Sequence, residues 1–168
     1  SGRNLSYRTS FYSIAPEFDT AVGFVRRRDI KRVRGDMGYR WWPDNWLINW
    51  GPEFDYSRNW NFDDVLQDEE VRVRLRMSFV SNIFLRADVR REMERYGGID
   101  FWKTRYSYSA NVNTSRRLSF GTSLNWGDQV RYSSSPFLGD GTSGSLFMSL
   151  RPFSRLQSQI NVSTSRLL

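Results

Sequence analysis

Three short stretches of the chain carry residue types that can bind ions or phosphate. "DDVLQDEE" (63–70) offers carboxylates for a hard cation, but it lacks the spacing of a calcium loop, so we expect a solvated acidic loop. "GDGTSG" (139–144) has the composition of a phosphate cradle. It lacks the terminal Lys–Ser/Thr and a following helix, which favours a flexible loop. "RRRDIKR" (26–32) suits a phosphate or nucleic acid, but Asp29 interrupts it, which favours the basic end of a loop.

Carboxylate pairs are the remaining candidates for catalysis. Glu92 and Glu94 have the chemistry of a general acid and base, but Arg90 and Arg95 flank them, which favours ion pairing. The 168 residues include no His and no Cys. That excludes imidazole chemistry, Ser–His–Asp triads, thiol nucleophiles, disulfides and the usual zinc sites. We therefore predict no catalytic residue, no metal site and no cofactor, and a protein that is not an enzyme.

The elements that position these residues have a period of two. In "VRVRLRMSF" (71–79), apolar residues alternate with Arg72, Arg74 and Arg76. Successive side chains of a strand point to opposite faces, so this is a strand with one wet and one apolar face. We expect the apolar positions of this strand and the next to face lipid or a partner: Val71, Val73, Leu75, Met77, Phe79, Leu85 and Val89.

The same alternation recurs along the whole chain, and helical periodicity is scarce. The predicted strands lie near 4–14, 30–42, 46–60, 71–79, 84–96, 102–113, 118–126, 146–150 and 157–163. The fold class is therefore all-β: an antiparallel up-and-down meander of about 8–10 long strands, forming an outer-membrane-type barrel or a partial barrel or sheet. No composition shift divides the chain, so residues 1–168 are expected to form a single domain.

The connections are expected to alternate in length. Long ones are predicted near 15–29, 60–69, 96–100 and 127–143, and short ones near 43–45, 81–83, 113–117 and 152–155. Short turns at one end and long loops at the other are typical of outer-membrane barrels.

Strand length and aromatic placement favour a membrane over water. Several strands keep their alternation for about ten residues, close to the 9–11 that cross a bilayer. We expect interface aromatics beside the turn at 43–45 and beside long loops: Trp41, Trp42, Trp46, Trp60 and Trp126. The alternative is a soluble sandwich, whose core also buries aromatics.

The polar faces of the fourth and fifth predicted strands allow a prediction of register. A three-residue turn at 81–83 sets Arg76 opposite Asp88 and Arg72 opposite Glu92. The predicted ion-pair lattice on this inner face consists of Arg72, Arg74, Arg76, Arg86, Asp88, Arg90 and Glu92. Arg91 falls on the apolar face, near the far edge of the membrane band.

Four segments carry a resemblance to a known group: "AVGFVRRRDIKRVRGDMGYRWWP" (21–43), "INWGPEFDYSRNW" (48–60), "GIDFWKTRYSYSANVNTSRRLSFGTSLNWGD" (99–128) and "PFLGDGTSGSLFMSLRPFSRL" (136–156). The chain resembles the C-terminal β-barrel region, a domain of unknown function, of bacterial outer-membrane proteins that carry an N-terminal family-9-like carbohydrate-binding domain. The resemblance implies an outer-membrane location and supplies no catalytic residues. The chain departs from the group in two ways: the carbohydrate-binding domain is missing, and the sequence stops at "STSRLL", where the group continues through further strands. Single-chain barrels have an even number of strands, so the expected nine mean either a count that is off by one or part of a wall.

Three functions stay open. The first is a non-enzymatic outer-membrane barrel wall segment that contacts membrane lipid and conducts or binds anionic solutes or glycans, since the net charge is +7. The second is a structural subunit that packs on other subunits of a membrane complex, in a part that faces the periplasm. The third is a soluble basic β-sandwich that binds nucleic acid or polysaccharide; we expect no nucleic acid partner for the first two.

Overall fold

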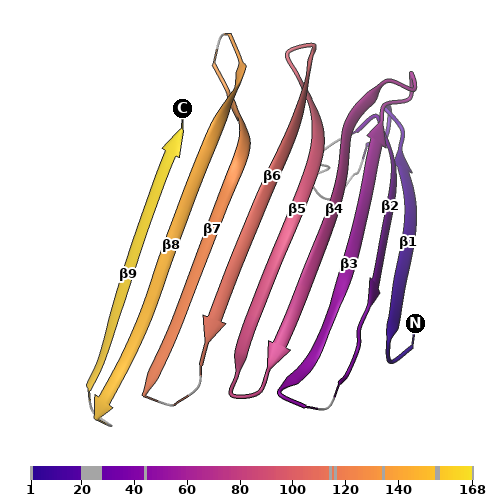
Figure 1. The fold of residues 1–168 in the computed structure, drawn as a ribbon. Coiled ribbons are helices and arrows are strands. Elements are labelled where there is room, and N and C mark those ends of the chain that lie inside the picture. The colour runs from indigo at the N-terminus through magenta and orange to yellow at the C-terminus, as the bar shows by residue number, and fades with distance from the viewer. Residues whose placement is uncertain are drawn as a thin grey trace.

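The described residues form one antiparallel sheet. The computed structural model describes residues 2–19, 28–43, 45–113, 115, 117–133, 135–153 and 156–167. The strands are β1 (Leu5–Ile14), β2 (Ile30–Tyr39), β3 (Leu47–Trp60), β4 (Leu66–Phe79), β5 (Ile83–Tyr96), β6 (Ile99–Val112), β7 (Leu118–Arg131), β8 (Phe137–Phe153) and β9 (Leu156–Leu167). They lie side by side in chain order (Figure 1), which confirms the all-β meander.

The sheet is open. Among the described residues, no pairing joins β9 to β1, so a partial barrel or sheet describes the fold. We call the end of the sheet at which β1 and β9 begin the lower end, and the end at which they finish the upper end, as they appear in Figure 1. No helix in the described part of the chain is long and apolar enough to cross a membrane.

Two tight turns join the central strands. Ser81 and Asn82 have positive φ (64° and 56°) between β4 and β5. Gly97 and Gly98 (φ 58° and 80°) join β5 to β6, and Tyr96 pairs with Ile99 across them. A two-residue hairpin whose central residues both need positive φ is the turn for which glycine is suited, because it has no Cβ.

The pairing register divides the side chains between two faces that continue across all nine strands. We call the face that holds Arg74 the polar face, and the face that holds Val73 the apolar face. Arg74 is aligned with Glu53 and Asp88, and Val73 with Phe54 and Val89. The alternation predicted for 71–79 is therefore present throughout the sheet.

No second layer of described residues covers the apolar face. Val73 is 51% exposed and Trp102 is 48% exposed, and no side chain in the described chain is fully buried. A sandwich would need a second sheet, whereas all nine strands belong to one. The few buried apolar residues are Ile30, Met93, Phe101, Ala110 and Val130.

The predicted alternation of long and short connections is wrong at three places. β4 begins at Leu66, so the loop expected at 60–69 shrinks to 61–65, and the connection expected at 96–100 is the turn at Gly97–Gly98. The acidic stretch 63–70 is half strand, because Asp68 and Glu70 pair with β3 and β5. Backbone pairing with two neighbours outweighs a polar composition there.

The long loop predicted at 127–143 is also mostly strand. Val130 pairs with Leu138, and the stretch 139–144, expected to be a flexible loop, lies inside β8. Trp126 is consequently an interior residue of β7 and does not flank a long loop. Parts of the segments 15–29, 26–32, 43–45, 113–117 and 152–155 lie outside the described residues.

Candidate functional site

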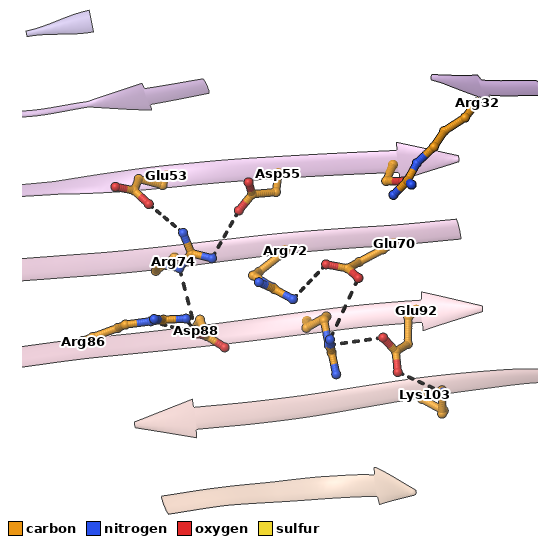
Figure 2. Close-up of polar contacts among 12 residues, drawn as sticks. Arg32, Glu53, Asp55, Glu70, Arg72, Arg74, Arg86, Asp88, Glu92 and Lys103 are labelled. Atoms are coloured by element: carbon orange, nitrogen blue, oxygen red, sulfur yellow. Dashed lines mark hydrogen bonds and ion pairs between the residues drawn. The ribbon is translucent and has the colours of Figure 1, made fainter. Parts of the chain in front are cut away.

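Arg74 is the centre of an ion-pair lattice on the polar face. Its Nη1 lies 2.7 Å from Glu53 Oε2, its Nη2 3.5 Å from Asp55 Oδ2, and its Nε 4.0 Å from Asp88 Oδ1. Arg76 shares Glu53 (3.1 Å), and Arg86 shares Asp88 (2.9 Å). Figure 2 shows the contacts of Arg74, which cross from β3 to β5.

A second branch of the lattice runs from β4 to β6, nearer the upper end. Arg72 Nη2 lies 2.9 Å from Glu70 Oε1, and Arg90 bridges Glu70 (3.9 Å) and Glu92 (3.2 Å). Lys103 then contacts Glu92 (3.0 Å; Figure 2). All seven residues predicted for the lattice take part in these two branches. The predicted lattice did not include six further members: Arg40, Glu53, Asp55, Glu70, Glu94 and Lys103.

The predicted register between β4 and β5 is wrong: each residue of β4 pairs with the β5 residue two positions before the one predicted. The turn occupies 80–82, so Arg76 is opposite Arg86 and Arg72 is opposite Arg90. Like charges directly across a sheet repel, and here the arginines contact carboxylates that lie diagonally on the next strand or two residues along their own strand. The predicted pairing of charged with charged positions holds, because the turn still has an odd number of residues.

The polar face changes character between β6 and β9. Hydroxyl and amide side chains replace charges there, and they line a hollow of about 330 Å³: Ser123, Asn125, Ser143, Ser145, Ser163 and Ser165. Ser123 and Ser145 hydroxyls lie 2.7 Å apart. Another hollow, of about 260 Å³, lies at the lower end between Arg40, Glu53 and Arg76. Such hollows and the burial of Arg74 and Lys103 show that side chains converge on this face.

The apolar face has a band without charges that ends at one line. On β2–β5, β7 and β9, the positions aligned with Val73 are uncharged for about 8 to 10 residues from the lower end, and a charged residue follows. On β8, which ends at Phe153, the uncharged stretch is longer, about 13 residues before Asp140. We call these charged residues the charged row: Lys31, Arg58, Glu69, Arg91, Asp128, Asp140 and Arg166. β6 has Thr104 at this level, opposite Arg91. Arg91, which the sequence places alone on the apolar face, is thus one member of a line across the sheet.

Aromatic side chains mark both boundaries of the band. Near the lower end Trp41 stacks on Trp50 (centroids 4.4 Å apart), and Trp46 stacks on Phe79 (5.5 Å). Trp42 departs from this arrangement, since its ring contacts the guanidinium groups of Arg3 and Arg40.

At the charged row, Trp60 and Trp102 lie under arginines, with Arg58 Cζ and Arg91 Cζ 5.1 and 5.2 Å from their ring centroids. Trp126 lies within the band and stacks on Tyr106 (5.5 Å).

Beyond the charged row, the hairpin and loop at the upper end carry their own polar contacts. Arg95 donates two hydrogen bonds to Asp100 (2.6 and 2.9 Å) across the Gly97–Gly98 turn, and this lowers the pKa of Asp100. The Tyr132 hydroxyl donates to Glu94 (2.9 Å). Partial burial and this carboxylate raise the pKa of Tyr132.

The lattice neutralises the carboxylates that were candidates for catalysis. Glu92 and Glu94 both contact Lys103, at 3.0 and 2.5 Å. In the part of the chain that the structure describes, no group of three or more acidic side chains has the arrangement of a metal site. The chemistry available on this face is therefore ionic cross-linking between strands and hydrogen bonding to water or solutes.

The chain was compared with protein-family models, with curated proteins and with solved structures, and none of these matches it.

Proposed function

We propose that this chain is a non-enzymatic wall segment of a bacterial outer-membrane β-barrel, with its apolar face toward lipid and its polar face toward water. The charge-free band carries the proposal. About 8 to 10 residues at ~3.4 Å per residue give about 27–34 Å along a strand. With strands tilted by about 40°, the band would be about 21–26 Å tall, against the ~25 Å expected for such barrels.

The arrangement of the two faces supports the same proposal. A bilayer leaves no water for an unpaired backbone, and each interior strand of this sheet pairs on both sides. The apolar side chains of this face are exposed, Val73 by 51%. If lipid covers them, they contact hydrocarbon instead of water, which is favourable. The lattice pairs charges of the opposite face on β3–β6. The excess of basic residues in the chain favours anionic solutes there.

Single cysteines test which face meets lipid, because the chain has none of its own. We would place Cys at Val73 and Leu146, and as matched controls at Arg105 and Ser145, and reconstitute each variant into neutral phosphatidylcholine vesicles. Nitroxide labels at Val73 and Leu146 are expected to collide with oxygen, and those at Arg105 and Ser145 with a water-soluble nickel chelate. Equal access of the chelate to all four positions contradicts the proposal.

A second candidate function rests on the two unpaired edges. β1 and β9 each leave one row of backbone N–H and C=O groups without a strand partner among the described residues. Exposed edges are sites of strand addition, so a subunit that packs on other proteins of a membrane complex is the alternative. If labels at Val73 and Leu146 lose access to oxygen only when a copurifying protein is present, this candidate replaces the first.

A further inference from the structure

Two arginines of the charged row, Arg58 and Arg91, combine a contact with a tryptophan ring and the absence of an ion-pair partner among the described residues. Every lattice arginine on the polar face has a carboxylate within 4.0 Å. Among the described residues, Arg58 and Arg91 have no such partner, and Nε of Arg58 is buried without a hydrogen-bond acceptor. Both lie on the apolar face, where a lone charge is costly unless a ligand or water reaches it.

Each of these arginines is held by a tryptophan. Arg58 lies over Trp60 on its own strand, and Arg91 on β5 lies over Trp102 on β6. A guanidinium stacked on an aromatic face keeps its edge, with its N–H donors, free to bind an oxyanion in a bidentate manner. Tryptophan also prefers the boundary between hydrocarbon and headgroups, which is the level that the proposed membrane position gives to this row.

The neighbouring charges leave this pair of arginines available. Glu69 lies opposite Arg58 in the register, but its Oε1 accepts the hydroxyl of Tyr56 (3.1 Å). Lys31, at the same level on β2, is engaged by Asp64 (2.8 Å). Further along the row, Asp128 accepts the backbone N–H of Thr104 (2.7 Å). Arg166 on β9 also has no ion pair among the described residues, but no tryptophan contact is seen for it and it lies four strands from Arg91. The two arginines that combine an unpaired charge with a tryptophan ring are therefore Arg58 on β3 and Arg91 on β5.

We infer that Arg58 and Arg91, stacked on Trp60 and Trp102, bind the phosphate groups of anionic lipids at the membrane boundary of the apolar face. This inference rests on the proposed membrane position and adds a ligand class to it. The occupant is a bilayer phosphate rather than a soluble one, because the two arginines sit at the edge of the charge-free band and not in a hollow of the polar face. Glu69, between them, is the unfavourable neighbour that limits the affinity.

The test compares lipid preference in variants of equal charge. R58Q/R91Q removes the two arginines, and R8Q/R34Q removes two exposed arginines of the polar face that have no ion pair among the described residues. The full chain in mixed micelles would be analysed by native mass spectrometry for retained phosphatidylglycerol over phosphatidylcholine. At about a fivefold contribution per basic residue near a headgroup, R58Q/R91Q should lose about 10- to 30-fold in preference, and R8Q/R34Q should lose none.

Further variants separate charge from geometry. R58K/R91K keeps the charge and loses the planar fork, so it should recover only part of the preference. E69Q removes the unfavourable carboxylate and should strengthen it. An equal loss in R8Q/R34Q, full recovery by lysine, displacement by inorganic phosphate, or no preference in the unchanged chain would each overturn the inference. The cysteine experiment in neutral vesicles contains no anionic lipid, so it can succeed while this one fails.

Discussion

Replacement of Arg74 by alanine should destabilise the sheet far more than replacement of Arg76. Arg74 is only 11% exposed, and it contacts Glu53, Asp55 and Asp88, whose side chains are 24%, 23% and 7% exposed. Removal of one partner from a buried ionic group costs about 3–5 kcal/mol, because the remaining charges lose their compensation. Arg76 is 47% exposed, so its contact with Glu53 should be worth about 0–1 kcal/mol.

The difference arises from what each variant leaves behind. In R76A, Glu53 keeps Arg74 at 2.7 Å. In R74A, Asp55 loses its contact, and among the described residues no other cation lies within 4.0 Å of it. Asp55→Asn in the R74A background should therefore recover part of the loss, since it removes the uncompensated charge.

The assay is urea unfolding in detergent micelles, followed by tryptophan fluorescence and fitted with a common slope. We expect R74A to lose about 3–5 kcal/mol and R76A about 1 kcal/mol or less. Costs for the two variants that agree within about 0.5 kcal/mol would refute the reasoning, as that would show that burial does not distinguish the two arginines.

Three further predictions concern the upper end. Because Arg95 lowers the pKa of Asp100, their contact should stabilise the hairpin fully above the ordinary aspartate pKa and lose this effect as the pH falls through the lowered pKa of Asp100. D100N should therefore lower the urea midpoint at neutral pH but not at strongly acidic pH. An equal decrease of the urea midpoint at both pH values would contradict this. Because the pKa of Tyr132 is raised above its ordinary value, Y132F should remove absorbance change from the alkaline side of a tyrosine titration. A curve whose alkaline side is unchanged in Y132F contradicts this assignment. G98V should lower the free energy of unfolding by about 1–2 kcal/mol through backbone strain, because φ at Gly98 is +80°. No atom lies within 4 Å of the added Cβ, so a steric clash does not contribute. G98N should lower it less, because asparagine tolerates positive φ, and equal urea midpoints for the two variants would argue against strain.

Much of the fold was predictable because it depends on local alternation. Val73 and Arg74 face opposite ways by the geometry of a strand, so the two faces and the nine strands follow from the sequence. The register was not, since a period of two fixes which face a residue occupies but not its partner. A turn at 80–82 and a turn at 81–83 both have three residues, so both put the same side chains on each face. The pairing of Phe79 with Ile83 shows that the turn is 80–82, and alternation alone does not predict that pairing.

The candidate site was only partly visible for a similar reason. Arg91 can be noticed as one charge among apolar residues, but the charged row becomes apparent only when Arg58 and Glu69 are aligned beside it. The stretch 139–144 was predicted to be a loop because glycine and serine are common in turns. It is a strand, because its pairing with β7 and β9 outweighs that preference.

The directions of the two outermost strands restrict how the sheet can meet a neighbour. β1 and β9 point the same way, from the lower end to the upper end. A seam made directly between them would be a parallel ladder, with slanted and evenly spaced hydrogen bonds, unlike the eight antiparallel ladders already present. An antiparallel ring through both of them needs an odd number of interposed strands, the first of which descends from the upper end beside Leu167.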